Sequence, residues 1–493
     1  MTNSSTRIDL DHIRRALAEL EPAPSHDATV PPATQQIYTP PGHESALDPE
    51  RVLVIGGRGT GKSFWSAALL DSTTRKFVSR SYPRLELRRC HVELGFGGVD
   101  ADINGAPSRE ELDDLIDVDG HKAEKIWRAI FLRAASRALQ LDVRNTLRGP
   151  RGLVAWVEQD AARTQQKLRE LDEELQKRDL RVIVLFDALD RLGRDWRQIR
   201  ERTRALLQVT LAFRTYKCIK PKIFLRVDQA DDAGVAAFPD ASKLLSSGAR
   251  VDLTWEQRDL YGLLYTLIAN HPAGGRSFAR VMEMATDIEI GSVKQNGLPR
   301  ELKDSEKLQA QVFVRLAGPY MGASASKGRT YTWLYKHLSD AFGRVSPRTF
   351  LEAVRKAAQY RAATDADFAI TPAGLRGGIQ AASELRVQQL KEEYGWIDTV
   401  LEPLADQQVP CPTGSLFERW TDAQTLAAIS DSKGEYLEPI EFSDDHGPQT
   451  STILKALLRI GVAERRADGR INIPDIYRVA AKMLRKGGVK PRR

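Results

Sequence analysis

The stretch RVLVIGGRGTGKSFWSAALL, residues 51–70, constrains the fold of this chain more than any other. The run RVLVI is apolar and β-branched, which is typical of a buried parallel strand. The next residues fit G-x-x-x-x-G-K-[ST] at Gly56, Gly61, Lys62 and Ser63, and FWSAALL after them has helical spacing. A strand, a glycine-rich turn and a helix in this order predict a loop whose backbone N–H groups surround phosphate oxygens.

The residue types of this loop indicate that it binds a nucleoside triphosphate together with a metal ion. Lys62 is expected to reach the β and γ phosphates, and the Ser63 hydroxyl is expected to ligate Mg²⁺. The predicted cofactors are therefore ATP and Mg²⁺. The predicted nucleotide-binding residues are Gly56, Gly57, Arg58, Gly59, Thr60, Gly61, Lys62, Ser63 and Phe64.

A second apolar run, in RVIVLFDALDRL at residues 181–192, predicts a strand over 182–186 that ends at a carboxylate. Asp187 follows this strand at the position where ligands of open α/β sheets bind, so we assign it to the magnesium site. Asp190 is the candidate for positioning or deprotonating the attacking water; its alternative role is to cap the next helix. No convincing N/T-K-x-D guanine signature follows this strand, which favours ATP over GTP.

The sequence FDALDR resembles the D-x-x-D/E pattern of KAP- and NACHT-type ATPases, within the STAND and AAA+ branch of P-loop proteins. The resemblance spans about residues 50–360 and implies an α/β fold, a P-loop NTPase core with a parallel sheet followed by a helical lid. Many relatives carry the water-activating acid directly after the metal-binding aspartate, where this chain has Ala188. This departure puts hydrolysis by the family mechanism in question.

The same resemblance implies three arginine roles. Arg226, near the end of the strand in KPKIFLRVDQAD, is expected to contact the γ-phosphate as a first sensor, with a surface or interface role as the alternative. Arg348, after Pro347 at the start of a predicted helix, corresponds to the second sensor of the lid. Arg250 lies in the region where ring-forming relatives place an arginine finger, which the STAND branch generally lacks. The predicted catalytic residues are Lys62, Asp187, Asp190, Arg226 and Arg348.

The 493 residues exceed what one hydrophobic core usually supports, so several domains are expected. The predicted organisation is an N-terminal helix at 1–21, a flexible proline-rich linker at 22–48, the P-loop NTPase core at 49–254 with a helical insertion at 88–180, a helical lid at 255–400, a winged-helix domain at 401–485 and a basic tail at 486–493. Within the insertion, TQQKLRELDEELQKR is interpreted as a solvated hairpin arm rather than a coiled-coil partner site.

The stretch QTSTILKALLRIGVAERRADGRINIPDIYRVAAKML predicts a helix stopped at Gly461, a two-stranded hairpin turning at Asp468 and Gly469, and a last helix. This pattern resembles a winged helix. Arginines on the hairpin, at 465, 466 and 470, can meet nucleic-acid phosphates, or the domain can serve packing and protein contact instead. The net charge of +7 and the basic tail suit contact with nucleic acid or another polyanion, and a basic tail that is merely solvated is the alternative.

The sequence lacks an apolar run long enough to span a membrane and an N-terminal secretory pattern, so no membrane partner and a cytoplasmic location are expected. The three cysteines have no metal-ligand spacing. These features leave three hypotheses. The first is an ATP-hydrolysing molecular switch that couples nucleotide state to assembly, for which the resemblance implies a protein partner or effector in trans, a homo-oligomer and a bacterial conflict or anti-phage setting. The second is a nucleic-acid-loading or remodelling ATPase, and the third is a nucleotide-binding scaffold that does not hydrolyse.

Overall fold

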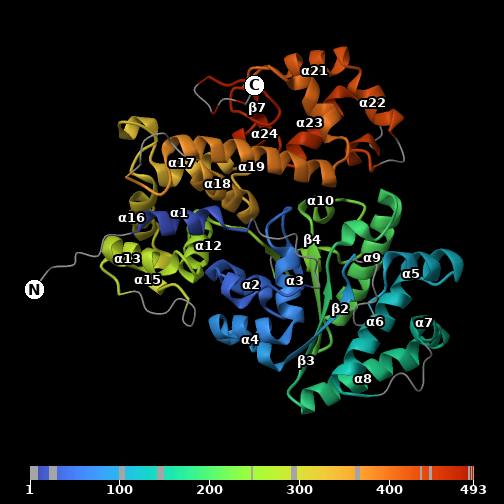
Figure 1. The fold of residues 1–493 in the computed structure, drawn as a ribbon. Coiled ribbons are helices and arrows are strands. Elements are labelled where there is room, and N and C mark those ends of the chain that lie inside the picture. The colour runs from blue at the N-terminus through green and yellow to red at the C-terminus, as the bar shows by residue number, and fades with distance from the viewer. Residues whose placement is uncertain are drawn as a thin grey trace, which may run out of the picture. The chain divides into compact units, whose positions relative to one another are not determined.

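The computed structural model describes residues 9–21, 30–98, 106–141, 149–245, 248–289, 297–360, 367–432, 436–443, 447–486, 489 and 491. The chain divides into two compact units (Figure 1). Ser25–Thr254 form the first, which we call the sheet unit. Met1–Pro24 together with Trp255–Arg493 form the second, which we call the helical unit. The chain therefore passes between the units twice, and each unit is described by itself below.

A five-stranded sheet with the strand order β2-β3-β4-β1-β5 forms the centre of the sheet unit. Its strands are β1 (Leu53–Ile55), β2 (Cys90–Phe96), β3 (Arg181–Phe186), β4 (Ile219–Leu225) and β5 (Arg250–Asp252). Every neighbouring pair is parallel. Because parallel strands end at the same edge of a sheet, the residues after β1, β3 and β4 meet there. This is a P-loop NTPase-like α/β fold, as the sequence predicted.

Helices cover both faces of the sheet because alternate strand residues point to opposite sides. Val182, Val184 and Phe186 of β3 belong to one core cluster, with residues of α6 and α9. Ile183 and Leu185 belong to the other, with residues of α3 and α4 (Figure 1). The helices of this unit are α2 (Glu44–Leu47), α3 (Lys62–Leu70), α4 (Ser72–Ser81), α5 (Arg109–Asp113), α6 (Ala123–Ala138), α7 (Gly149–Gln159), α8 (Ala161–Lys177), α9 (Trp196–Phe213), α10 (Val227–Ala230) and α11 (Ser242–Leu245).

The segment 88–180, predicted as an insertion that contains helices, also contains β2, an edge strand of the sheet that the sequence pattern did not reveal. The sequence HVELGF carries two titratable residues among its apolar ones, which obscured the strand. In the structure Glu93 is buried and accepts from Arg137 at 3.1 Å, and His91 lies 2.9 Å from the same carboxylate. A buried carboxylate is tolerated when such partners compensate its lost hydration.

The charged helix α8 is also not a solvated arm. It buries Leu168, Leu171 and Leu175 in the core of the sheet unit. Its Asp172 carboxylate accepts from three successive backbone N–H groups at the start of β4, those of residues 217, 218 and 219, at 2.9, 2.7 and 3.1 Å. The leucine spacing of three and four residues gives α8 one apolar face, which packs while the charged face stays in solvent.

Part of the predicted flexible linker is ordered and packed. Residues 22–29 lie outside the described residues, but Ile37, Tyr38 and Leu47 are buried in the sheet unit. The Tyr82 hydroxyl donates to the Pro40 carbonyl at 2.5 Å. Prolines fix the backbone here, and the apolar residues between them supply enough buried surface to hold the segment in place.

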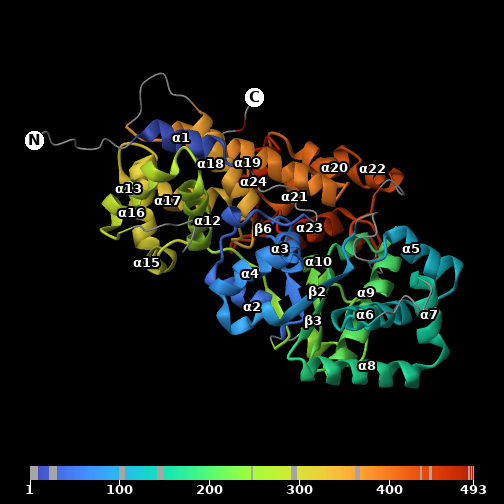
Figure 2. The same cartoon turned by 60° about the horizontal axis from the view of Figure 1, so that its bottom comes forward.

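The helical unit begins with α1 (Leu10–Ala18), which packs beside α18 (Pro347–Gln359) (Figure 2). Arg14 donates to the carbonyls of residues 369 and 368 at 3.2 and 3.1 Å, and Gln359 donates to the Ala18 carbonyl at 3.0 Å. The N-terminal helix therefore docks on its own chain. The other helices are α12 (Gln257–Asn270), α13 (Gly275–Thr286), α15 (Arg300–Asp304), α16 (Glu306–Ala317), α17 (Thr330–Leu338), α19 (Pro372–Glu393), α20 (Ile397–Leu401), α21 (Thr413–Asp422), α22 (Thr425–Asp431), α23 (Thr450–Arg459) and α24 (Asp475–Arg478).

The C-terminal elements follow the predicted order. Helix α23 gives way at Gly461, with φ +75°, to the antiparallel strands β6 (Glu464–Arg465) and β7 (Ile471–Asn472), which enclose the turn at Gly469. The last helix, α24, has only four residues and is shorter than expected. Buried Arg478 ends it by donating to the carbonyls of residues 483 and 489 at 2.9 and 2.6 Å. The winged-helix assignment stays a prediction, and most of the basic tail lies outside the described residues.

Among the residues that the structure describes, no helix combines the length and apolar character needed to cross a membrane.

Candidate nucleotide-binding site

The loop between β1 and α3 has a backbone that requires its glycines. Gly59 and Gly61 have φ of +78° and +98°, a conformation that residues with a Cβ rarely adopt. A Cβ on Gly56 would lie 2.5 Å from the Thr60 hydroxyl oxygen, which donates to the Gly57 carbonyl at 2.8 Å. Helix α3 then begins at Lys62, so its N-terminal N–H groups face the loop.

The Lys62 ammonium lies inside the curve of its own loop. It donates to the carbonyls of Gly56 and Gly57 at 2.8 and 2.9 Å. These carbonyl oxygens stand in for the phosphate oxygens that a lysine at this position is expected to bind. An anionic phosphate is the stronger acceptor, because a hydrogen bond between two charged groups is stronger than a hydrogen bond to a neutral carbonyl.

Ser63 and Asp187, which are far apart in sequence, meet at the edge of the sheet. The Ser63 hydroxyl lies near enough to the Asp187 carboxylate to lower its pKa, and Lys62 is close enough to act on this carboxylate electrostatically. Helix α3 makes this contact because it packs on one face of the sheet. That face carries Ile183 and Leu185 of β3, which are four and two residues before Asp187. The Asp187 backbone N–H donates to the Phe96 carbonyl at 2.9 Å, which fixes the end of β3 to β2.

The Asp187 carboxylate is buried and incompletely satisfied. Asp187 is only 2% exposed, and its Oδ2 has no hydrogen-bond partner within the described part of the chain. Burial raises the pKa of Asp187, while the Ser63 hydroxyl and the Lys62 charge lower it in part. A buried carboxylate oxygen without a donor indicates that the chain leaves this atom for a ligand outside it.

A magnesium ion fits this donor set. Mg²⁺ prefers oxygen ligands, and in nucleotide sites it takes one or two protein oxygens while phosphate and water supply the rest. Asp187 Oδ2 and the Ser63 hydroxyl are such a pair. The described residues contain no group of three or more His, Cys, Asp or Glu side chains suited to a metal, so a site made by the protein alone is not found among them.

Asp190 lies in the short 3₁₀ turn Leu189–Arg191, after Ala188, which has φ of +54°. Its Oδ2 is 3.4 Å from Nη1 of Arg226, and its side chain is 36% exposed. The negative charge of Asp190 is near enough to Asp187 to raise the pKa of Asp187. The structure thus brings Asp190 to the same sheet edge as Asp187, with access to solvent.

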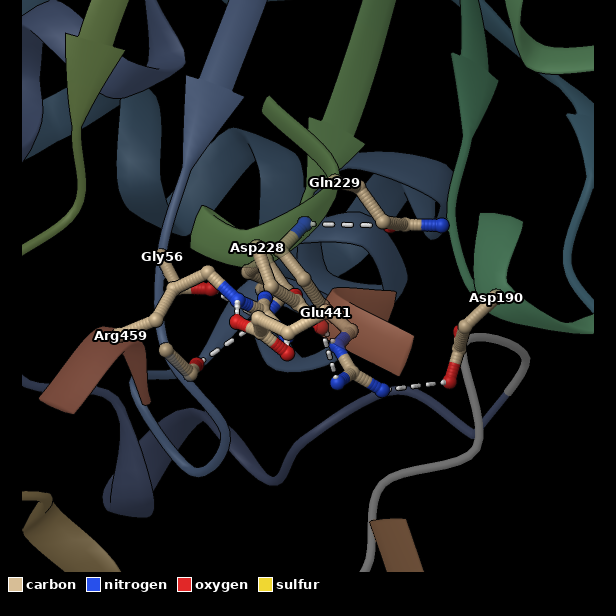
Figure 3. Close-up of polar contacts among 9 residues, drawn as sticks. Gly56, Asp190, Asp228, Gln229, Glu441 and Arg459 are labelled. Atoms are coloured by element: carbon tan, nitrogen blue, oxygen red, sulfur yellow. Dashed lines mark hydrogen bonds and ion pairs between the residues drawn. The ribbon is translucent and has the colours of Figure 1, made fainter. Parts of the chain in front are cut away.

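Arg226 caps α10 and forms a fork with Asp228. Its Nε and Nη2 donate to the two oxygens of that carboxylate at 3.0 and 2.6 Å (Figure 3). Its backbone N–H donates to the Gln229 side-chain oxygen at 3.3 Å. The sequence pattern did not point to Asp228 and Gln229, which lie in α10 two and three residues after Arg226.

The two remaining arginine candidates differ in what surrounds them. Arg250 is in β5, where its guanidinium lies 3.2 Å from Asp252 and 3.8 Å from Asp231. Arg348 is the second residue of α18 in the helical unit, after Pro347, and Ser346 caps this helix by accepting from the N–H of residue 349 at 3.2 Å. The structure therefore bears out the predicted helix start, and the sensor role of Arg348 stays a prediction.

Two buried residues that the sequence analysis passed over hold the segment before β1. His43 accepts from the Trp65 indole at 3.0 Å, and its Nε2 lies 3.0 Å from the Thr254 carbonyl, which fixes a neutral tautomer. Burial lowers the pKa of His43 to about 4. Lys222 donates to three carbonyls, those of residues 46, 48 and 51, and burial lowers its pKa to about 7. Both side chains connect the segment before β1 to the rest of the sheet unit.

The arginines of the β6–β7 hairpin are exposed or half-buried. Nε and Nη2 of Arg470 both donate to Oδ2 of Asp468, at 2.9 and 2.7 Å, which neutralises part of the charge at the turn. Arg465 makes long contacts of 3.3 and 3.5 Å to Gly469 and Thr413. Arg465 is therefore held more loosely than Arg470.

No protein-family model matches this chain, and no curated protein matches it either. Among solved structures, one of the similar chains is that of the ORC2 protein of Aeropyrum pernix, solved as ADPNP–ADP complexes. It is 13% identical, the match covers 90% of this chain and 93% of that chain, and the TM-score is 0.30. A similarity of this size does not establish a shared function, so the residues themselves carry the functional argument.

Proposed function

We propose that this chain binds ATP with Mg²⁺ at the β1–α3 loop and hydrolyses it as a molecular switch. The observation that carries the proposal is the meeting of Ser63 with Asp187, whose buried Oδ2 has no hydrogen-bond partner in the described part of the chain. A glycine-dependent loop, a lysine and a carboxylate at one sheet edge match the chemistry of phosphoryl transfer.

In this proposal the chain positions the nucleotide and neutralises its charge. Lys62 exchanges the carbonyls of its loop for phosphate oxygens, and the N–H groups at the start of α3 bind further phosphate oxygens. Ser63 and Asp187 hold the magnesium ion, which supplies electrostatic stabilisation of the charge that develops on the phosphates. Asp190, at the solvent-accessible part of this edge, orients the attacking water and accepts its proton.

The switch follows from the chemical difference between ATP and ADP. Arg226 contacts the terminal phosphate, so its surroundings differ before and after hydrolysis. Arg348 keeps its proposed role as the second sensor. A separate polypeptide, or further copies of this chain, would bind the ATP and ADP states with different affinity, since a switch needs a partner that distinguishes its two states.

The test is equilibrium binding of ATP, ADP and GTP to the full chain, with and without Mg²⁺, combined with phosphate-release measurements. We expect Mg²⁺-dependent binding, a preference for ATP and slow turnover. Absence of any nucleotide binding would overturn the proposal. Tight binding without turnover would instead support the non-hydrolysing scaffold, which Ala188 at the usual position of the acid favours.

A second candidate function is a nucleic-acid-loading ATPase, favoured by the loosely held Arg465 on the β6–β7 hairpin. Such arginines bind phosphates without reading sequence. We would measure turnover of the full chain with and without duplex DNA or RNA. Stimulation that Arg465→Ala and Arg466→Ala together abolish would favour this function, and equal rates with and without nucleic acid would exclude it.

A further inference from the structure

The segment that follows β4 fixes the direction of Arg226 with its own side chains. Both oxygens of the Asp228 carboxylate are occupied, by Nε and Nη2 of Arg226 at 3.0 and 2.6 Å. The two side chains are 11% and 7% exposed. The Gln229 side chain holds the backbone N–H of Arg226 at 3.3 Å. The guanidinium and the backbone of this arginine are thus fixed from the same four-residue helix, α10.

The contact of Arg226 with Asp190 differs in kind from its contact with Asp228. It joins only Nη1 to one oxygen, at 3.4 Å, and the Asp190 side chain is 36% exposed. A single long contact near solvent contributes little, whereas a buried two-point fork between charged groups is strong and directional. An incoming anion can therefore replace Asp190 at Nη1 while Asp228 keeps Nε and Nη2.

We propose that Asp228 is a positioning residue that aims Nη1 of Arg226 at the terminal phosphate and thereby sets the discrimination between a nucleoside triphosphate and a diphosphate. This inference rests on the function proposed above. The arginine stem is flexible, so an unrestrained guanidinium would sample many directions. The fork restricts it before the nucleotide arrives, so less of the binding free energy is spent on ordering the side chain.

The experiment measures the dissociation constants of ADP and of the non-hydrolysable triphosphate AMPPNP with the full chain, at fixed Mg²⁺, by calorimetry. Asp228→Asn keeps the size of the side chain and removes its charge. We expect ADP affinity within about threefold of wild type, and a roughly tenfold loss in the ratio of AMPPNP to ADP affinity, the size expected for one charge-assisted hydrogen bond. Arg226→Ala should lose the same factor, and the double variant should lose no more than Arg226→Ala alone.

A matched control is available next to this site. Asp232 accepts from Nε of Arg200 at 2.8 Å, and its side chain is 5% exposed, so Asp232→Asn breaks a comparable buried pair outside the nucleotide site. This variant should keep the wild-type ratio. An unchanged or increased ratio in Asp228→Asn, or additive losses in the double variant, would overturn the inference and leave the proposed function intact. Wild-type protein that binds neither nucleotide would overturn both.

Discussion

The Ser63 hydroxyl lies beside the carboxylate of Asp187, a residue buried at the end of β3. This contact joins the first turn of α3 to a strand that is not adjacent to β1 in the sheet, because β4 lies between them. It places a hydroxyl and a carboxylate oxygen beside the loop that holds the Lys62 ammonium. The predictions below test whether this arrangement serves a nucleotide.

Asp187→Asn should abolish binding of the magnesium–nucleotide complex without destabilising the nucleotide-free protein. Burial raises the pKa of Asp187, so the ionised carboxylate is costly in the folded state, and a neutral amide removes that cost. We expect the urea midpoint without nucleotide to stay level or rise, and magnesium-dependent affinity to fall more than about 100-fold.

Asp172→Asn is the matched control for that prediction, since Asp172 is also buried in the sheet unit but accepts from three backbone N–H groups. An amide in its place leaves at least one of these donors unpaired, so this variant should lose about 1–3 kcal/mol of stability. If Asp187→Asn destabilises the protein as much, its carboxylate is a structural acceptor and the magnesium assignment is wrong.

Lys62→Ala should reduce ATP affinity by at least about tenfold and eliminate turnover, because the loop loses the ammonium that faces the phosphates. In the nucleotide-free protein this ammonium donates to two carbonyls of its own loop, at 2.8 and 2.9 Å, and we expect the variant to keep the fold. Lys76→Ala, on the exposed side of α4, is the charge-matched control. Normal ATP hydrolysis by Lys62→Ala would show that the nucleotide does not bind at this loop.

Asp190→Asn should bind AMPPNP within about threefold of wild type and hydrolyse ATP about 100-fold more slowly, the usual contribution of a general base. Asp231→Asn, which removes an exposed carboxylate at the other end of α10, should keep the wild-type rate. Single-turnover phosphate release separates the chemical step from nucleotide exchange. Equal rates in Asp190→Asn and wild type would show that another group orients the attacking water and accepts its proton.

Because of His43, the free energy of unfolding of the sheet unit should decrease as the pH falls. Its pKa is about 4 in the fold and about 6.5 when unfolded, so between these pH values the unfolded chain binds a proton that the folded chain excludes. The contribution of His43 is therefore complete above about pH 6.5 and is lost progressively as the pH falls toward 4, by about 3 kcal/mol in total.

The measurement compares urea unfolding of wild type and His43→Gln at pH 7.5 and pH 5.0. We expect His43→Gln to be less stable than wild type at pH 7.5, since it loses the ring between Trp65 and the Thr254 carbonyl. The difference between the two proteins should shrink at pH 5.0. A constant difference would mean that His43 does not titrate in this range.

The sequence predicted the parts of the fold that depend on neighbouring residues. Strands β3 and β4, the start of α18 and the β6–β7 hairpin stand where apolar periodicity, proline and the Asp468–Gly469 turn indicated. It missed the strand β2 and the packing of the predicted helix α8, because charged residues there pair with groups distant in sequence: Glu93 with Arg137, and Asp172 with the start of β4. Composition alone cannot distinguish such a charge from a solvated one.

The conformation of the phosphate loop is determined by the sequence itself, since only glycine adopts the backbone of Gly59 and Gly61 at low cost and a strand and a helix flank the loop within twenty residues. The sequence predicted that Asp187 shares a site with Ser63, but the contact of Arg226 with Asp190 was decided only by the tertiary structure. The physical reason is that the strand order places β4 between β1 and β3, and this order follows from packing of both sheet faces rather than from any local pattern.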